Sequence, residues 1–178
     1  MDVLVCVKRV PDTSEAELEI TRDAKGLVDD DLAWGVNEWD NFAVEAAVRL
    51  KEAHGGTVTA ITVGGDDDEE VLRRALAMGA DVAEHLADDA FAGLDAAGVA
   101  RVLRAAIGDR TFDLVLTGAV SGDAGQGAVG AILAALLDVP SVALATDLQI
   151  DGAEAVVRHE VEGGRERVVA LPLPALVT

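Results

Sequence analysis

The 178-residue sequence predicts an α/β fold, a doubly wound parallel sheet in one domain spanning residues 1–178. Short apolar runs alternate with helical patterns of ten to fifteen residues, which is typical of βαβ units with right-handed crossovers. Hydrophobic residues make up 51% of the chain, enough to bury a substantial core. No apolar run reaches the about 18 residues that a membrane span needs, and the N-terminus lacks a signal-peptide pattern. We therefore expect a cytoplasmic protein.

The first apolar run, residues 3–7, leads into a turn at Pro11 and predicts the central strand. The carboxyl end of such a strand should face a ligand. Residues 18–21 and 26–28 flank a turn signal, so they predict a small hairpin near the N-terminus that stands off the main sheet.

Asn37 marks the expected start of the first helix, because asparagine is a good N-cap residue. Glu38 and Asp40 follow in the first turn, where negative charge is favoured, and an apolar stripe continues to Leu50. Capping is the more common role for such an asparagine. The helix starts near the carboxyl ends of the strands, however, so Asn37 could also reach a nucleotide.

The rest of the chain continues the alternation. Strands are expected at 57–63, 82–86 and 112–116, and helices at 66–78 and 93–107. Residues 141–150 are expected to continue the parallel sheet, whereas residues 153–161 and 166–171 predict a C-terminal hairpin.

The stretch 112–140 runs from a strand through a glycine-rich loop into an apolar helix pattern that begins near Ala124. The glycines let backbone N–H groups approach a ligand, and a helix start leaves N–H groups without intrahelical partners. Such a place suits a phosphate, and Ser121 and Asp123 add a hydroxyl group and an acceptor. A flexible crossover would use the same glycines. Residues 125–130 match G-x-G-x-x-G, but weakly, because the Rossmann fingerprint belongs against the first strand.

The composition is strongly acidic, with 33 Asp and Glu against 14 Lys and Arg and a formal net charge of −19. Such a surface repels nucleic acid, so no nucleic-acid partner is expected. The acidic residues are spread along the chain, which favours adaptation to a salt-rich cytoplasm over binding to a basic partner.

Few side chains of this sequence suit metal binding or catalysis. Cys6, the only cysteine, lies in an apolar run, where a buried small hydrophobic side chain is the usual role. The three histidines have neither metal-ligand spacing nor a nearby Ser or Cys. We therefore expect no metal site and no catalytic residues.

Four segments resemble the β subunit of electron-transfer flavoproteins. They are VLVCVKRVPD, NEWDNFAVEAAVRLKEA, RRALAMGAD and EVEGGRERVVALPLPALVT, and the resemblance runs from Met1 to Thr178. It implies a Rossmann-like sheet of the adenine-nucleotide-hydrolase type and a subunit that holds AMP but is not itself an enzyme. It also implies a heterodimer with an FAD-carrying α subunit, which passes electrons from acyl-CoA or other dehydrogenases to the respiratory chain.

The resemblance also implies the residues that contact AMP, at the strand ends, the first-helix turn and the glycine-rich loop. They are Cys6, Asn37, Glu38, Trp39, Asp40, Val63, Gly118, Ser121, Gly122, Asp123, Gly125, Gln126, Gly127, Ala128, Val129 and Gly130. Many relatives carry an Asn-Gln-Thr-containing loop here. In this chain, backbone contacts would have to replace some of those side-chain contacts.

Relatives continue beyond the LPxPALVT pattern into an arm that embraces the α subunit, whereas this chain ends at Thr178. The predicted C-terminal hairpin should therefore expose apolar surface, and we expect the isolated chain to form a homodimer. Two other functions remain open. The same pocket could hold FAD, as in relatives that bifurcate electrons, or the chain could be a stand-alone adenine-nucleotide-binding module of the universal-stress type.

Overall fold

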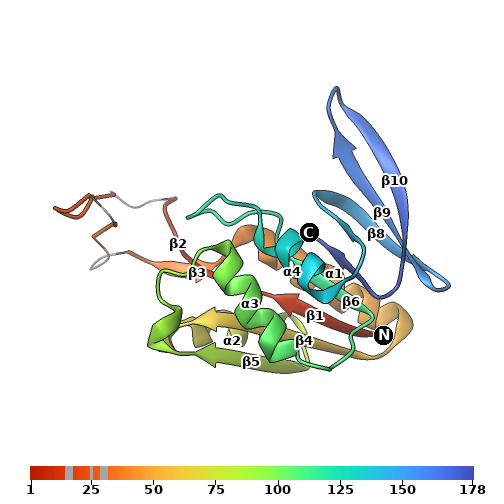
Figure 1. The fold of residues 1–178 in the computed structure, drawn as a ribbon, viewed down its shortest axis with the longest axis horizontal. Coiled ribbons are helices and arrows are strands. Elements are labelled where there is room, and N and C mark those ends of the chain that lie inside the picture. The colour runs from red at the N-terminus through yellow and green to blue at the C-terminus, as the bar shows by residue number, and fades with distance from the viewer. Residues whose placement is uncertain (15–17, 25, 29–31) are drawn as a thin grey trace.

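A six-stranded parallel sheet forms the middle layer of the protein, with the strand order β5-β4-β1-β6-β11-β7 (Figure 1). The computed structural model describes residues 1–14, 18–24, 26–28 and 32–178. The strands of this sheet are β1 (Asp2–Cys6), β4 (Thr57–Gly64), β5 (Val82–Ala87), β6 (Leu114–Thr117), β7 (Ser141–Val142) and β11 (Ala175–Val177). The helices are α1 (Glu38–His54), α2 (Glu69–Met78), α3 (Ala96–Ile107) and α4 (Val129–Leu137). The predicted α/β class and the central position of the first strand are confirmed.

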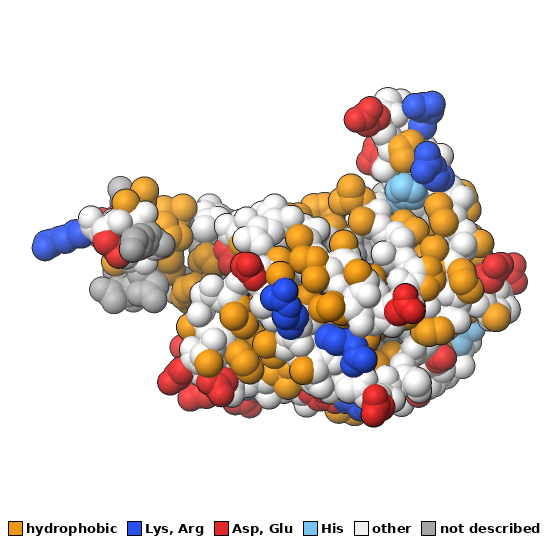
Figure 2. Space-filling view, in the orientation of Figure 1, with side chains coloured by type: hydrophobic (Ala, Val, Ile, Leu, Met, Phe, Trp, Pro, Cys, Tyr) orange, Lys and Arg blue, Asp and Glu red, His pale blue; other side chains and the backbone are white. Residues whose placement is uncertain are grey.

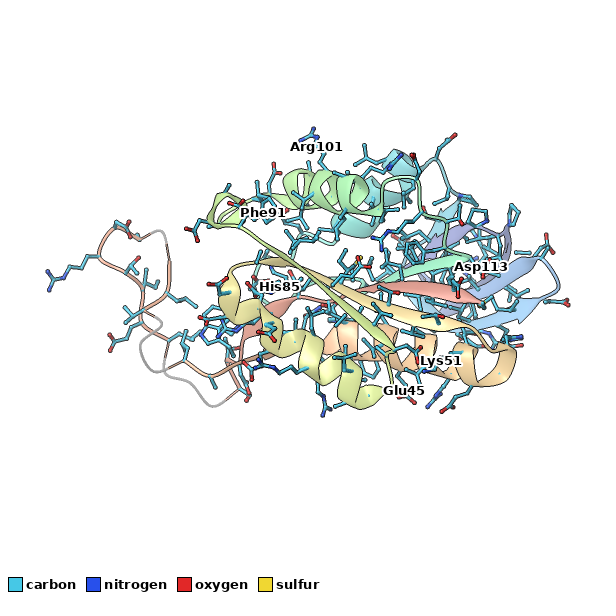
Figure 3. The ribbon with its side chains drawn as sticks, turned by 90° about the horizontal axis from the view of Figure 1, so that it is seen from below. Glu45, Lys51, His85, Phe91, Arg101 and Asp113 are labelled. Carbon is cyan, nitrogen blue, oxygen red and sulfur yellow. The ribbon has the colours of Figure 1, made fainter. Side chains whose placement is uncertain are left out.

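Helices cover both faces of the sheet, with α1 and α2 on one side and α3 and α4 on the other (Figure 3). Side chains alternate between the two faces along each strand. Val3 and Val5 of β1 therefore pack with α1 and α2, whereas Leu4 packs with α3 and α4. All three side chains are fully buried, which explains why the strand is an unbroken apolar run.

The C-terminal part of the chain forms a second, antiparallel sheet that projects from the domain (Figure 1). Its strands are β8 (Ala145–Asp151), β9 (Glu154–Val161) and β10 (Arg165–Pro172). The predicted hairpin of β9 and β10 is confirmed. The expectation that residues 141–150 continue the parallel sheet is wrong beyond β7, because the chain turns at Leu144, where φ is +59°, and β8 then pairs with β9. The last three-residue strand, β11, returns to the main sheet and was not predicted.

The N-terminal hairpin also stands off the main sheet, as predicted (Figure 1). Two short antiparallel strands, β2 (Arg9–Pro11) and β3 (Trp34–Val36), form its base. Farther out, an antiparallel bridge joins Ile20 to Leu27. The base was not predicted, since a three-residue strand that ends in proline gives no periodic signal.

Three helices begin later than the sequence pattern indicates. The helix expected from Ala124 begins at Val129, because Gly125 and Gly127 adopt φ of +63° and +56° and keep the preceding residues in a loop. The pattern at 66–78 divides into a short 3₁₀ turn, η1 (Asp66–Asp68), and α2. The pattern at 93–107 becomes a helix only at Ala96, after a second 3₁₀ turn, η2 (Asp89–Phe91).

None of the described helices has both the length and the apolar character to cross a membrane. Among the same residues, no three or more His, Cys, Asp or Glu side chains come together in a way that could hold a metal ion.

Candidate functional site

A cleft lies at the carboxyl edge of the parallel sheet, over the ends of β1, β4 and β6. Its empty space is about 850 Å³ with the open mouth included. Part of the lining is apolar and comes from β4 and from α3 and the segment before it: Ile61, Val63, Leu94, Val99 and Leu103. The remainder comes from the start of α1, the end of β1 and the loop between β6 and α4.

Asp40, in the first turn of α1, joins three elements beneath this cleft. Its carboxylate accepts hydrogen bonds from the backbone N–H of Lys8 (2.7 Å) and of Gly118 (3.1 Å). The side-chain amide of Asn37 donates a third hydrogen bond to it (3.0 Å). Asp40 is only 5% exposed. Burial raises the pKa of Asp40 to about 6, even though these hydrogen bonds and the charge of Lys8 favour the ionised form.

The side chain of Asn37 holds the loop after β6 instead of capping α1. Its Nδ2 donates to the carbonyl oxygen of Val120 (2.9 Å), and its Oδ1 accepts from the N–H of Gly122 (3.2 Å). The side chain makes no capping hydrogen bond to the helix, although Asn37 occupies the N-cap position. Asn37 therefore sets the path of the loop across the edge of the sheet.

Two glycines at this edge are required by close packing. A Cβ atom on Gly118 would lie 2.0 Å from Oδ1 of Asp40, and one on Gly130 would lie 2.5 Å from Cγ2 of Thr178. Gly122, in contrast, has no atom within 4 Å of an added Cβ. Close packing thus requires glycine at the root of the loop and at the start of α4, but not at position 122.

Lys8 and Asp123 connect the end of β1 to the middle of the loop. The ammonium Nζ of Lys8 donates to Oδ1 of Asp123 at 2.7 Å. Partial burial opposes ionisation of Asp123, but hydrogen bonds from Lys8, from the Ser121 hydroxyl and from the Ala124 N–H outweigh it and lower the pKa of Asp123. Asp123 is therefore ionised at neutral pH.

The first turn of α4 opens toward the cleft without a side-chain cap. Ala128 occupies the N-cap position, and no side chain there accepts a hydrogen bond from the backbone of the first turn. The next residue, Val129, borders the cleft. The start of α3 differs, because the Asp95 carboxylate accepts from the N–H of Gly98 (2.7 Å). Backbone N–H groups of α4 can therefore bind an anion, as helix N-termini commonly do.

The structure brings most of the sequence-predicted contact residues to this one cleft. Those that line it are Cys6, Asn37, Asp40, Val63, Gly118, Ser121, Gln126, Gly127, Ala128 and Val129. Those outside its lining are Glu38, Trp39, Gly122, Asp123, Gly125 and Gly130. Burial, followed by the charge of Asp40, raises the pKa of the Cys6 thiol to about 12. The thiol is therefore un-ionised, as expected for a small apolar side chain in the strand.

Sequence reasoning missed several lining residues. They are Val7, Lys8, Ile61, Leu94, Ala96, Val99, Leu103, Thr117, Ala119, Val120 and Ala124. Lys8 could have been found, because it follows the central strand directly at its carboxyl end. The residues from α3 could not, since their spacing is that of ordinary core residues.

A second, wider groove separates α1 from the projecting antiparallel sheet. Trp39 and Phe42 of α1 lie on one side of it, and Leu144, His159 and Arg167 also contribute to its lining. The two aromatic side chains and Leu144 are exposed. Figure 2 shows acidic and basic side chains together on the projecting sheet, so this region combines exposed apolar and charged groups.

A doubly wound sheet with a cleft at the carboxyl ends of its strands defines a ligand-binding α/β protein of the Rossmann-like class. The sequence profile of the electron transfer flavoprotein domain matches residues 25–178. The chain belongs to the electron transfer flavoprotein family, as its sequence indicated, and its role is that of the β subunit. Members of this family are electron carriers associated with a flavin.

Three relatives are matched along the whole of this chain. The electron transfer flavoprotein subunit beta of Bacillus subtilis is 41% identical, and 68% of that protein is covered. The protein of the same name from Thermoanaerobacterium thermosaccharolyticum is 38% identical, with 67% covered. The caffeyl-CoA reductase-Etf complex subunit CarD of Acetobacterium woodii is 37% identical, with 68% covered.

Proposed function

We propose that this β subunit binds AMP in the cleft and supports an α subunit that carries the redox-active FAD. In this proposal AMP is a structural ligand, and the chain contributes no redox group of its own. Electrons pass from acyl-CoA or other dehydrogenases to the flavin of the α subunit and on to the respiratory chain. The partner subunit and AMP are both taken from the family resemblance, and the chemistry of the cleft supports the choice of ligand.

The observation that carries the proposal is the uncapped start of α4 beside an apolar wall. The backbone N–H groups of the first turn favour a phosphate. Ile61, Val63 and Leu103 provide the apolar surface that a purine base requires. A mononucleotide combines these two parts, so the residues present fit AMP.

The exposed side chains of the second groove support an interaction with another protein. Trp39, Phe42 and Leu144 expose apolar surface next to polar and charged groups of the antiparallel sheet. Exposed aromatic groups surrounded by polar residues are typical of protein interfaces. We therefore place the α subunit at this groove.

Extraction of the nucleotide from the purified protein tests the ligand. The protein is denatured in acid, and the supernatant is analysed by chromatography. AMP alone supports the proposal. FAD would indicate a dinucleotide in the same pocket, as in a bifurcating complex, and ATP would indicate a stand-alone nucleotide-binding module. Co-expression with the cognate α subunit, followed by co-purification and a flavin absorbance spectrum, tests the partner separately.

A further inference from the structure

Lys8 is the only Lys or Arg that lines the cleft among the described residues. The whole chain carries a formal net charge of −19, which opposes the approach of a phosphate. We propose that Lys8 recognises the phosphate of the nucleotide, and that Asp123 competes with this phosphate for the Lys8 ammonium group. The inference rests on the proposed function, and it gives a binding role to a residue outside the sequence-predicted contacts.

The backbone of Lys8 is fixed on both sides, which leaves only its side chain to change partner. Its N–H donates to the buried Asp40 carboxylate (2.7 Å), and its carbonyl oxygen accepts from the N–H of Asn37 (2.9 Å). Both contacts belong to the start of α1. The Lys8 side chain thus begins from a fixed point on the cleft wall, and its flexible methylene chain can direct the ammonium to different anions.

The pair between Lys8 and Asp123 is suited to partner exchange. The two side chains are 45% and 31% exposed, and ion pairs at such positions add little to stability. The Asp123 carboxylate is partly exposed, so water can replace the Lys8 ammonium as its partner. Lys8 can therefore leave without exposing an unsatisfied buried group.

The carboxylate of Asp123 remains negative when Lys8 turns to the phosphate. A negative charge near the bound phosphate opposes binding, and the effect is absent for a ligand without a phosphate. The phosphate contribution can thus be isolated by comparing AMP with adenosine. Both ligands share the base and the ribose, so contacts to those parts cancel in the comparison.

The test measures the affinities of AMP and adenosine by calorimetry for the wild type, Lys8→Gln and Asp123→Asn. We expect Lys8→Gln to weaken AMP binding by about tenfold or more, the usual effect of losing a charge-assisted contact. We expect Asp123→Asn to strengthen AMP binding, because a competing anion is removed. Neither substitution should change the affinity for adenosine.

The Lys51–Asp81 pair provides matched controls, since Lys51 Nζ donates to Asp81 Oδ1 (2.9 Å) outside the cleft. Lys51→Gln and Asp81→Asn should leave both affinities unchanged. If Lys8→Gln weakens AMP and adenosine equally, or affects neither, the inference is wrong although the proposed function stands.

Two further outcomes complete the test. If Lys8→Gln does not fold, the AMP affinity of Asp123→Asn becomes the test. An unchanged or reduced AMP affinity of that variant overturns the inference. A wild-type protein that binds neither AMP nor adenosine refutes the proposed function and this inference with it.

Discussion

At each of the two edges of the parallel sheet, aspartate carboxylates accept hydrogen bonds that connect neighbouring segments. The electrostatic environments of the two edges are opposite. At the amino edge, Asp81 accepts from the N–H of Val58 (2.8 Å) and from Lys51 Nζ (2.9 Å). Asp113 accepts from the N–H of Asp2 at the same edge (2.7 Å). Figure 3 shows Lys51 and Asp113 at this end of the sheet, away from His85 and Phe91. At the carboxyl edge, Asp40 makes the equivalent connections from a buried position.

The pKa values of Asp81 and Asp40 are shifted in opposite directions at the two edges. Hydrogen bonds from Val58 and Lys51 lower the pKa of Asp81, so its ionised form stabilises the fold. Burial raises the pKa of Asp40 to about 6, so its ionised form is held against a desolvation penalty. The ionised Asp81 at the amino edge therefore stabilises the fold. The ionised Asp40 at the carboxyl edge lowers the stability while it holds the loop and the end of β1 beside the cleft. Such local penalties are common at functional sites.

The largest expected effect comes from filling the space between Gly118 and Asp40. In Gly118→Ala the new Cβ would lie 2.0 Å from Oδ1 of Asp40 and 3.0 Å from its backbone nitrogen, so the carboxylate or the loop must move. We expect a loss of about 3 kcal/mol or more in the free energy of unfolding, near the upper end for overpacked sites. Urea denaturation measures it.

Gly122→Ala is the matched control, because an added Cβ there has no atom within 4 Å. Its free energy of unfolding should stay within about 0.5 kcal/mol of the wild-type value. Equal losses in the two variants would show that replacing either glycine is destabilising by itself, and that contact with Asp40 is not the reason.

The next effect is a pH dependence that belongs to Asp40. Its pKa is about 6 in the folded protein against 3.8 for the free side chain, so the folded state binds the proton more tightly. The resulting stabilisation is fully present below pH 3.8 and is lost as the pH rises through 6. A shift of this size corresponds to at most about 3 kcal/mol.

Asp40→Asn removes this titration. The difference in unfolding free energy, wild type minus variant, should therefore increase as the pH falls from about 6 to about 4. Denaturation curves for both proteins at several pH values measure it, and other titrating groups cancel in the difference. A difference that does not vary with pH would show that Asp40 titrates normally.

The sequence was sufficient for the features that depend on local pattern, and insufficient for those that depend on distant partners. The apolar run of residues 3–7, followed by the turn at Pro11, was enough to predict β1 and its central position in the sheet. The function of the Asn37 side chain could not be predicted, because its loop partners are 83 and 85 residues away in the sequence. A local pattern only marks Asn37 as a possible cap.

The late start of α4 and the pairing of β11 had similar causes. Residues 124–128 have helical apolar spacing, but the positive φ angles of Gly125 and Gly127 keep them in a loop. A β11 of three residues is too short to show a period, and tertiary pairing with β6 and β7 defines it.

At the amino edge the pH effect should have the opposite sign. The folded pKa of Asp81 is depressed, so its contribution is present above pH 3.8 and is lost as the pH falls through the folded value. We expect Asp81→Asn to lower the unfolding free energy by about 1 kcal/mol or less at pH 7, because the pair with Lys51 is partly exposed. The penalty should disappear in acid. A penalty that grows on acidification would contradict the assigned direction.

The smallest effect separates charge attraction from hydrogen bonding at Asp81. The side chains of Lys51 and Asp81 are 21% and 42% exposed, so salt should screen their attraction, with a Debye length of about 3 Å at 1 M against about 10 Å at 0.1 M. The penalty of Asp81→Asn should therefore shrink, by roughly half a kcal/mol at most, when 1 M KCl replaces 0.1 M KCl. The pH-dependent difference for Asp40→Asn should not change, since buried groups are screened much less. Denaturation of both variants and the wild type at the two salt concentrations measures this. If the loss of unfolding free energy in Asp81→Asn does not depend on salt, the hydrogen bond from the Val58 N–H accounts for the stabilisation by Asp81. The attraction between Lys51 and Asp81 then adds nothing to it.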